Sequence, residues 1–195
     1  MLKDHLKDFK IILASASPRR QQFFEELGLE FEIRLKSVEE VYPDHLKGAE
    51  ISDYLAALKA SPHMKELQED EILITSDTVV WHNNTSLAKP RDAKEAYNMI
   101  KTLSDDWHEV ITSVCFTTSK TQKTEYHSTR VKFKPLSDDE IWYYINNFKP
   151  FDKAGGYGIQ EWIGLIGIEQ IEGSYANVVG LPTHIVYKTL MDMAS

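Results

Sequence analysis

Hydrophobic residues along the chain occur partly in short continuous runs and partly at helical spacings, a combination that predicts an α/β fold. The runs 10–14 (KIILA) and 71–81 (EILITSDTVVW) are predicted as strands. Ser17 and Pro18 are typical of a helix start, and Gly28 is typical of a helix end. We therefore expect a strand, a tight loop and a helix at the beginning of the chain.

Helical spacing returns twice before residue 105. A second helix is predicted from Ala49 to about Ser61, where Pro62 ends it, and a third from Pro90 to Leu103. Asp92 and Glu95 stand at capping-box spacing near the start of the third helix. The apolar face of the second helix is predicted to contain Tyr54, Leu55 and Leu58, and that of the third Ala96, Tyr97, Ile100 and Leu103.

Polar turns between β-rich runs predict two hairpins. The pair Asn83-Asn84 predicts a hairpin from the run 71–81 into Leu87. Residues 110–118 and 124–133 are predicted as antiparallel strands around a polar loop. Antiparallel pairs of this kind argue against a purely parallel, doubly wound sheet.

The last third of the chain begins with a fourth helix, from Ser137 to about Phe148, with Glu140 at capping-box spacing. A glycine-rich segment (residues 154–160) and a β-rich stretch follow, and Pro182 is expected to start a final helix. The predicted fold class is α/β, with a mixed, partly antiparallel twisted sheet and flanking helices. We expect residues 1–195 to form one domain, or one domain with two lobes around a central cleft.

Composition excludes several classes of protein. The 195 residues include 22 Lys+Arg and 30 Asp+Glu, a net charge of −8 that argues against broad nucleic-acid binding. The single cysteine, Cys115, cannot form an intramolecular disulfide or a cysteine-rich metal site. The charged N-terminal segment does not have the pattern of a signal peptide, and no run is long enough for a membrane span, so we expect a cytoplasmic protein.

Residues 15–20 (SASPRR) are the first candidate site. Their two serines and two arginines lie at a predicted helix N-terminus, where backbone N–H groups and guanidinium groups can hold phosphate oxygens. A capped helix with solvated arginines explains the same pattern equally well. Both interpretations stay open on the residues alone.

Carboxylates suggest a second site. Asp77 interrupts a strand that is otherwise suited to burial, so it needs a base, a metal or a place at the strand end. Glu39 and Glu40 read as a solvated loop by themselves, but together with Asp77 they would suit Mg²⁺. Lys59 and Lys89 are further candidates, although a lysine at the end of a helix, as predicted for Lys59, is favourable for structural reasons alone.

The stretch 151–160 (FDKAGGYGIQ) is the third candidate. Its glycines allow a ligand to approach the backbone closely, and Gln160 carries both a donor and an acceptor that could pair with a base edge. The stretch matches neither a Walker A loop nor a Rossmann fingerprint. Asp152 and Lys153 could equally form a structural ion pair.

In their order along the chain, these motifs closely resemble the Maf family of nucleotide pyrophosphatases, from about Ile11 to Leu190. The stretch after Gln160 departs from the family pattern, because Glu161-Trp162 stands where glycine is expected, which bears on base selectivity. The motifs that carry the resemblance are SASPRR (15–20), Glu40, Lys59, SDTVV (76–80), KPRDA (89–93), DKAGGYGIQ (152–160) and GSYANVVGLP (173–182).

The resemblance implies hydrolysis of nucleoside triphosphates, most like the dTTP/UTP branch, to the monophosphate and pyrophosphate with Mg²⁺ or Mn²⁺. It also implies an inosine-triphosphate-pyrophosphatase-like fold and allows a homodimer. It assigns catalysis to Asp77 and the metal to Asp77 and Glu40. The residues implied for phosphate binding are Ser15, Ser17, Arg19, Arg20, Lys59 and Lys89, and those for base selection are Arg19, Thr78 and Gln160.

Two alternatives remain beside this function. One is a non-catalytic nucleotide-binding regulator of septum formation, a role with which the family is also associated. Intact Asp77 and Glu40 argue against it, because a pure binder need not keep a carboxylate that activates water. The other is a pyrophosphatase for inosine or xanthosine triphosphate. The substrate, the preferred metal and the oligomeric state do not follow from the sequence.

Overall fold

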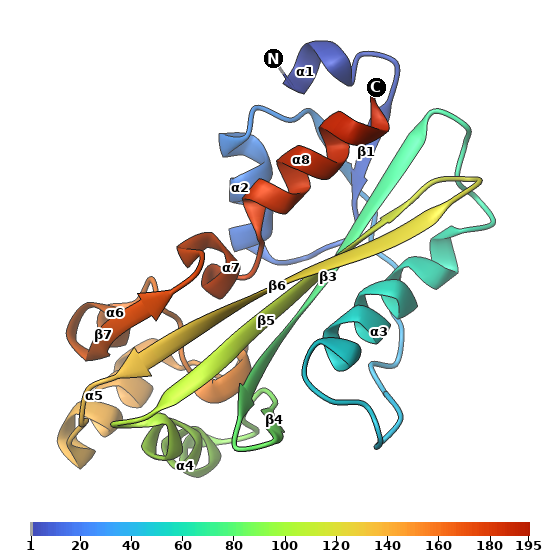
Figure 1. Cartoon of the computed structure of the whole chain (residues 1–195). Coiled ribbons are helices and arrows are strands. Elements are labelled where there is room, and N and C mark those ends of the chain that lie inside the picture. Colours follow the sequence, from blue (N-terminus) through green and yellow to red (C-terminus); the bar gives the residue numbers. More distant parts are fainter. Residues whose placement is uncertain (1) are drawn as a thin grey trace. The chain divides into compact units, whose positions relative to one another are not determined.

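The computed structural model describes residues 2–195 (Figure 1). Its strands form one sheet in the order β2-β1-β3-β5-β6-β7, with β4 paired to β3. The strands are β1 (Lys10–Leu13), β2 (Phe31–Ile33), β3 (Glu71–His82), β4 (Thr85–Leu87), β5 (Trp107–Thr117), β6 (Gln122–Phe133) and β7 (Ile168–Glu172). The helices are α1 (Leu2–His5), α2 (Pro18–Glu26), α3 (Ala49–Ala60), α4 (Ala93–Leu103), α5 (Asp138–Phe148), α6 (Trp162–Gly167), α7 (Tyr175–Val179) and α8 (Thr183–Met193), with 3₁₀ turns η1 (Ser61–His63) and η2 (Ala154–Gly156).

The mixed sheet predicted from the sequence is confirmed. Strand β1 pairs in parallel with β2 and β3, whereas β4 runs antiparallel to β3 and β7 antiparallel to β6. Strands β5 and β6 are neighbours joined by a four-residue loop, a connection too short for a parallel pair. The hairpin at Asn83-Asn84 is also present, and both asparagines have positive φ as a tight hairpin turn requires.

The chain forms two compact units. Unit 1 contains the chain up to Asp77, residues 112–127 and residues 180–195. Unit 2 contains residues 78–111 and 128–179. Strands β3, β5 and β6 each begin in one unit and end in the other, so Asp77 is the last residue of unit 1 on β3 and Thr78 the first residue of unit 2.

The core of unit 1 has two layers because strand side chains alternate. On β1, Ile11 and Leu13 pack with α2 and α8, whereas Ile12 packs with α3. The same alternation on β3 separates Ile72 and Ile74 from Leu73. Helices therefore cover both faces of these strands, and Figure 1 shows α2 and α8 on one side and α3 on the other.

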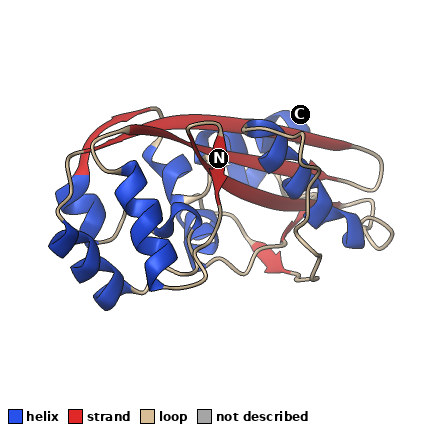
Figure 2. Ribbon diagram, turned by 90° about the horizontal axis from the view of Figure 1, so that it is seen from below, coloured by secondary structure: helices blue, strands red, loops and turns tan. Residues whose placement is uncertain are grey.

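The core of unit 2 lies on one face of its strands. Val80, Val110 and Val131 pack there against residues of α4, α5 and α6. In Figure 2 these helices gather on the same face of the strands. Every second residue points the other way, so Trp81 and Trp107 lie on the opposite face of β3 and β5, where they are half-buried.

Several predicted boundaries need correction. Helix α4 begins at Ala93 rather than Pro90, because the Asp92 carboxylate accepts a hydrogen bond from the Glu95 backbone N–H at 2.8 Å and so caps the helix. The Glu95 carboxylate accepts hydrogen bonds from Arg91 instead of from the Asp92 backbone N–H, so the second hydrogen bond of the capping box is not formed. Tyr54 does not share the buried face of α3, since it is 41% exposed.

The sequence pattern does not predict helices α1, α6 and α7. The segment of α6, WIGLIG, has no polar residue that could reveal helical spacing, so the pattern places it in a β-rich stretch. The last helix begins at Thr183, with Pro182 as its N-cap residue. Among residues 2–195, no helix is both long enough and apolar enough to cross a lipid bilayer.

A buried histidine makes the stability of the protein depend on pH. Nε2 of His108 lies 2.6 Å from the Tyr157 hydroxyl, and burial lowers the pKa of His108 to about 3. Because the unfolded chain then binds a proton that the folded chain does not, this stability is fully present above pH 6.5 and is lost as pH falls toward 3. The loss amounts to about 1.4 kcal/mol per pH unit.

Urea unfolding at pH 7 and pH 5 measures this effect. We expect the free energy of unfolding to fall between the two values by about 2 kcal/mol more in the parent protein than in His108→Gln. The exposed His5, replaced by glutamine, is the control and should leave the pH dependence unchanged. Equal pH dependence in His108→Gln and the parent would contradict the assignment.

Candidate functional site

Helix α3 is held against β3 by a buried hydrogen bond that sets the register between the two elements. The Thr75 hydroxyl on β3 donates to the Ala56 carbonyl on α3 at 2.6 Å. Two residues further along β3, Asp77 points to the same face as Thr75. Lys59 lies three residues after Ala56 on α3, and its ammonium donates a hydrogen bond to the Asp77 carboxylate.

Lys59 lies between two carboxylates. Its Nζ is 2.6 Å from Oδ1 of Asp77 and 3.2 Å from Oε2 of Glu40. The Asp77 side chain is only 10% exposed and that of Lys59 20%, whereas that of Glu40 is 47% exposed. A nearly buried carboxylate needs a partner of opposite charge, and Lys59 provides it. The structure therefore joins three of the predicted site residues within unit 1.

The loop that carries Glu40 is anchored at its beginning by Arg34 and Lys36. Arg34 forms a two-pronged ion pair with Glu71, with Nη2 at 2.9 Å from Oε1, and this hydrogen bonding lowers the pKa of the Glu71 carboxyl. Lys36 donates to the Pro62 carbonyl at 3.0 Å. These contacts anchor the chain just before Glu40 to β3 and η1.

Arg20 lies at the beginning of α2 and turns toward the same group of charges. Its guanidinium donates to the carbonyls of Gly180 at 2.9 Å and Ser76 at 2.8 Å. Burial lowers the pKa of Arg20 and the nearby Asp77 carboxylate opposes that shift, while arginine stays protonated at any physiological pH. Arg20 therefore brings a fixed positive charge close to Asp77.

The loop before α2 is compact. Ser15 is buried, and its hydroxyl oxygen accepts a hydrogen bond from the Ser17 N–H at 3.3 Å. Ser17 is the N-cap residue as predicted, although its side chain makes no capping hydrogen bond. Arg19, next to Arg20, is half-buried. All the candidates of residues 15–20 therefore lie in unit 1 at the start of α2.

Three further candidates belong to unit 2. Thr78 is half-buried and follows Asp77 on β3, whereas Lys89 is exposed and lies between β4 and α4. Gln160 is exposed at the end of the glycine-rich segment, and its amide has no hydrogen-bond partner among residues 2–195. An amide without internal partners keeps its donor and acceptor for a ligand.

Close contacts explain the glycines before Gln160. Gly155 has a φ of +70°, and a Cβ there would lie 3.0 Å from Cγ1 of Val80. Its N–H donates to the Ala88 carbonyl at 3.2 Å. Lys153 forms the predicted ion pair with Asp152 at 2.7 Å and a second one with Glu161 at 3.0 Å.

Asp77 and Glu40 also offer a suitable pair of ligands for a divalent cation. Both carboxylates already contact one cationic group, the Lys59 ammonium, so they lie within reach of a common centre. Mg²⁺ typically binds to one or two carboxylates and completes its coordination with substrate phosphates and water. Among the residues that the structure describes, no cluster of three or more His, Cys, Asp or Glu side chains provides a protein-only site.

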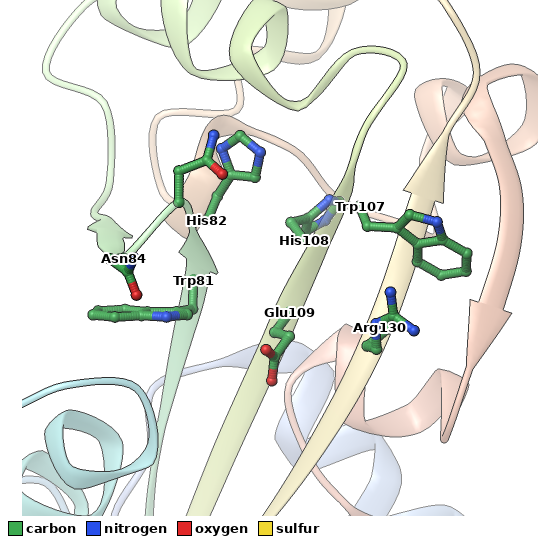
Figure 3. Close-up of a pocket in the computed structure, with 8 residues that line it drawn as sticks. Trp81, His82, Asn84, Trp107, His108, Glu109 and Arg130 are labelled. Atoms are coloured by element: carbon green, nitrogen blue, oxygen red, sulfur yellow. The ribbon is translucent and has the colours of Figure 1, made fainter.

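A pocket of about 280 Å³ lies elsewhere, on the open face of unit 2 (Figure 3). Its charged side chains already have partners, since Arg130 pairs with Glu172 at 2.7 Å and Glu109 accepts a hydrogen bond from Ser128 at 2.7 Å. Figure 3 shows Arg130 beside the ring of Trp107. None of the predicted site residues lines this pocket, and it does not offer the charge that a triphosphate needs.

Sequence reasoning missed two groups of residues around these candidates. Thr75, which sets the register of α3, gave no signal because a threonine in a strand is ordinary. Tyr144 and Glu161 support the glycine-rich segment through hydrogen bonds. The only signal for this second group is the Glu161 that stands where the resemblance led us to expect glycine.

Comparison with known proteins places the chain in a family. A model of the family described as Maf-like protein matches residues 10–193. The dTTP/UTP pyrophosphatase of Flavobacterium johnsoniae is 59% identical over 97% of this chain and 98% of its own length. The protein of the same name from Christiangramia forsetii is 58% identical over 99% and 98%.

A solved structure also shares the fold. The Staphylococcus aureus Ham1 protein superposes with a TM-score of 0.54 over 94% of this chain and 99% of its own, at 13% sequence identity. That likeness supports the architecture, whereas the family match and the close relatives concern the sequence itself. Because the family model covers residues 10–193 and the relatives are 58–59% identical over almost the whole chain, the chain belongs to the Maf family.

Proposed function

We propose that the protein hydrolyses dTTP and UTP to the nucleoside monophosphate and pyrophosphate in the cytoplasm. The observation that carries the proposal is Lys59 held between Asp77 and Glu40 at 2.6 Å and 3.2 Å. This arrangement places a nearly buried carboxylate in contact with a lysine that can also contact phosphate. Relatives of 58–59% identity that are named dTTP/UTP pyrophosphatase support the choice of substrate.

In the proposed reaction, Asp77 orients a water molecule and accepts its proton. The water oxygen bonds to the α-phosphorus, the bond from that phosphorus to the bridging oxygen breaks, and pyrophosphate leaves with the bonding electrons. Positive groups that neutralise the triphosphate lower the barrier because charge shifts onto the leaving group. We assign this role to Arg19, Arg20, Lys59 and Lys89, with the hydroxyls of Ser15 and Ser17 as further phosphate contacts.

A divalent cation, Mg²⁺ or Mn²⁺, fits Asp77 and Glu40. When bound, it supplies charge neutralisation and lowers the pKa of a water molecule in its coordination shell. Asp77 and Glu40 would hold it, and Lys59 would then be free to contact phosphate oxygens. Residues 1–195 act in this proposal as a single Maf domain.

Base selection is assigned to Arg19, Thr78 and Gln160. The exposed amide of Gln160 can accept a hydrogen bond from N3–H of uracil or thymine and donate one to a neighbouring carbonyl. Cytosine has no N3–H, so in the same orientation the amide carbonyl of Gln160 would find no N–H donor at that position of the base. Discrimination therefore depends on a fixed orientation of the amide, because a flipped amide would match the acceptor N3 and the donor N4–H₂ of cytosine.

Pyrophosphate release from a panel of nucleoside triphosphates tests the proposal. The purified protein is assayed with UTP, dTTP, CTP, GTP, ITP and XTP in Mg²⁺, in Mn²⁺ and in EDTA. We expect pyrophosphate and monophosphate from UTP and dTTP with either metal, and no turnover in EDTA. Preference for ITP or XTP, or nucleotide binding without turnover, would reject the proposal in favour of the alternative functions. Light scattering of the same sample shows whether it forms a homodimer.

Gln160→Ala is expected to reduce selectivity more than rate. Without the amide, the ratio of kcat/KM for UTP to that for CTP should fall by about tenfold or more, because at least one net hydrogen bond to the base is lost. Gln170→Ala, at an exposed position on β7, is the matched control. An equal loss of kcat/KM for every nucleotide would instead give Gln160 a structural role.

A further inference from the structure

We propose that Glu161 is a positioning residue, which acts through Tyr144 and Lys153 to hold the glycine-rich segment and so to set the base selectivity of Gln160. The inference rests on the proposed function for its effect on selectivity. Its structural part, the restraint of residues 154–160, stands on contacts within unit 2 alone.

Glu161 follows Gln160 directly and is the N-cap residue of α6. Its carboxylate does not cap the helix but faces back toward the glycine-rich segment. Oε2 accepts a hydrogen bond from the Tyr144 hydroxyl, and Oε1 pairs with Lys153 Nζ at 3.0 Å. The side chains of Lys153 and Glu161 are only 10% and 20% exposed, so water screens this ion pair little.

Tyr144 extends the contact to the backbone of the segment. It is fully buried on α5, and its hydroxyl oxygen accepts a hydrogen bond from the Gly158 N–H at 3.0 Å. Burial and the hydrogen bond to Glu161 raise the pKa of Tyr144, so the phenol stays protonated. One chain of hydrogen bonds therefore runs from the Gly158 N–H through the Tyr144 hydroxyl to the Glu161 carboxylate.

The ion pair joins the two ends of the segment. Lys153 immediately precedes it and Glu161 immediately follows it, so their contact closes a loop of seven residues, 154–160. Both side chains also pack on the backbone inside the loop, since a Cβ at Gly158 would lie 2.9 Å from Cε of Lys153 and 3.0 Å from Cδ of Glu161. The chain between them has little room to move.

This restraint compensates for the flexibility of the segment. Gly155, Gly156 and Gly158 give the backbone more freedom than other residues would, and Gln160 itself is exposed. An amide that reads a base edge must keep its orientation, because hydrogen bonds weaken steeply with misalignment. The contacts of the Glu161 carboxylate with Tyr144 and Lys153 restrain the backbone next to Gln160.

Two conservative variants test the inference. Glu161→Gln keeps the shape but removes the charge that faces Lys153, and Tyr144→Phe removes the hydroxyl that bonds Gly158 and Glu161. Glu169→Gln and Tyr143→Phe, both at exposed positions of unit 2, are the matched controls. Hydrogen exchange of residues 154–161, thermal unfolding, and kcat and KM for UTP and CTP are measured for all four and for the parent.

We expect faster exchange of residues 154–161 in both test variants, by about tenfold for the loss of one net hydrogen bond. The ratio of kcat/KM for UTP to CTP should fall by a similar factor, mainly through a higher KM for UTP. The controls should match the parent. These results would support the inference, because a merely structural role lowers thermal stability without changing the ratio between two substrates.

Unchanged exchange in Glu161→Gln and Tyr144→Phe would overturn the inference, whatever their activity. Faster exchange with an unchanged UTP to CTP ratio would overturn its link to selectivity. If the parent shows no preference for UTP over CTP, the proposed function fails, and the exchange data alone then decide whether Glu161 restrains the segment.

Discussion

Asp77→Asn is expected to lower kcat for pyrophosphate release from UTP by about 10²–10⁴-fold, the usual effect of losing a general base. Asparagine has almost the same shape, and its carbonyl oxygen can still accept a hydrogen bond from Lys59. It cannot take a proton from water at neutral pH, and it is a weaker ligand for a divalent cation. The fold should survive, because the Lys59 ammonium keeps its contact with Glu40.

Steady-state kinetics and circular dichroism of the same preparation check this result. Asp8→Asn is the control, since Asp8 is exposed on the segment between α1 and β1. It should retain the kcat of the parent. A kcat within about threefold of the parent in Asp77→Asn would remove Asp77 from the role of base, since that factor is far below the usual contribution of such a group.

Gly164→Ala is expected to have the largest effect on stability. A Cβ at Gly164 would lie 1.7 Å from the carbonyl oxygen of Ile159, a distance that only a shift of the backbone can relieve. We expect a loss of about 3 kcal/mol or more in the free energy of unfolding, as for severe overpacking. Because Ile159 directly precedes Gln160, the same shift should also reduce selectivity between UTP and CTP.

Chemical denaturation compares Gly164→Ala with Gly167→Ala on the same helix. At Gly167 a Cβ would meet side-chain atoms of Leu136 and Phe133 at 3.2 Å, and those side chains can adjust by a few tenths of an ångström. The control should therefore lose much less stability than Gly164→Ala. Similar losses in both variants would show that α6 adapts without the contact to Ile159.

Much of the fold could be predicted because local signals agreed with the final structure. The short apolar run 10–14 predicts a buried strand, and Lys10–Leu13 form β1. The pair Ser137 and Glu140 forms a complete capping box, which fixes the start of α5. Where local and tertiary effects compete, as for the apolar segment of α6, periodicity could not separate a helix from a strand.

The candidate site could be predicted only in part. Asp77 drew attention because a carboxylate in an apolar strand requires a partner, and the structure gives it Lys59 at 2.6 Å. The partner itself could not be derived, since it depends on the register that the Thr75 hydrogen bond imposes on α3. The contact between Tyr144 and Glu161 joins α5 to α6 and leaves no trace in residue spacing.

The division of the chain between the units has a consequence for synthesis on the ribosome. The core of unit 1 includes Leu181, Val186 and Leu190, each fully buried and each worth about 1.5–3 kcal/mol. These side chains emerge after residue 179, and by then all residues of unit 2 have left the exit tunnel. Domains usually fold in the order of translation. Here unit 2 can be completed before unit 1, because the apolar strands β1 and β3 of unit 1 pack against side chains of α8.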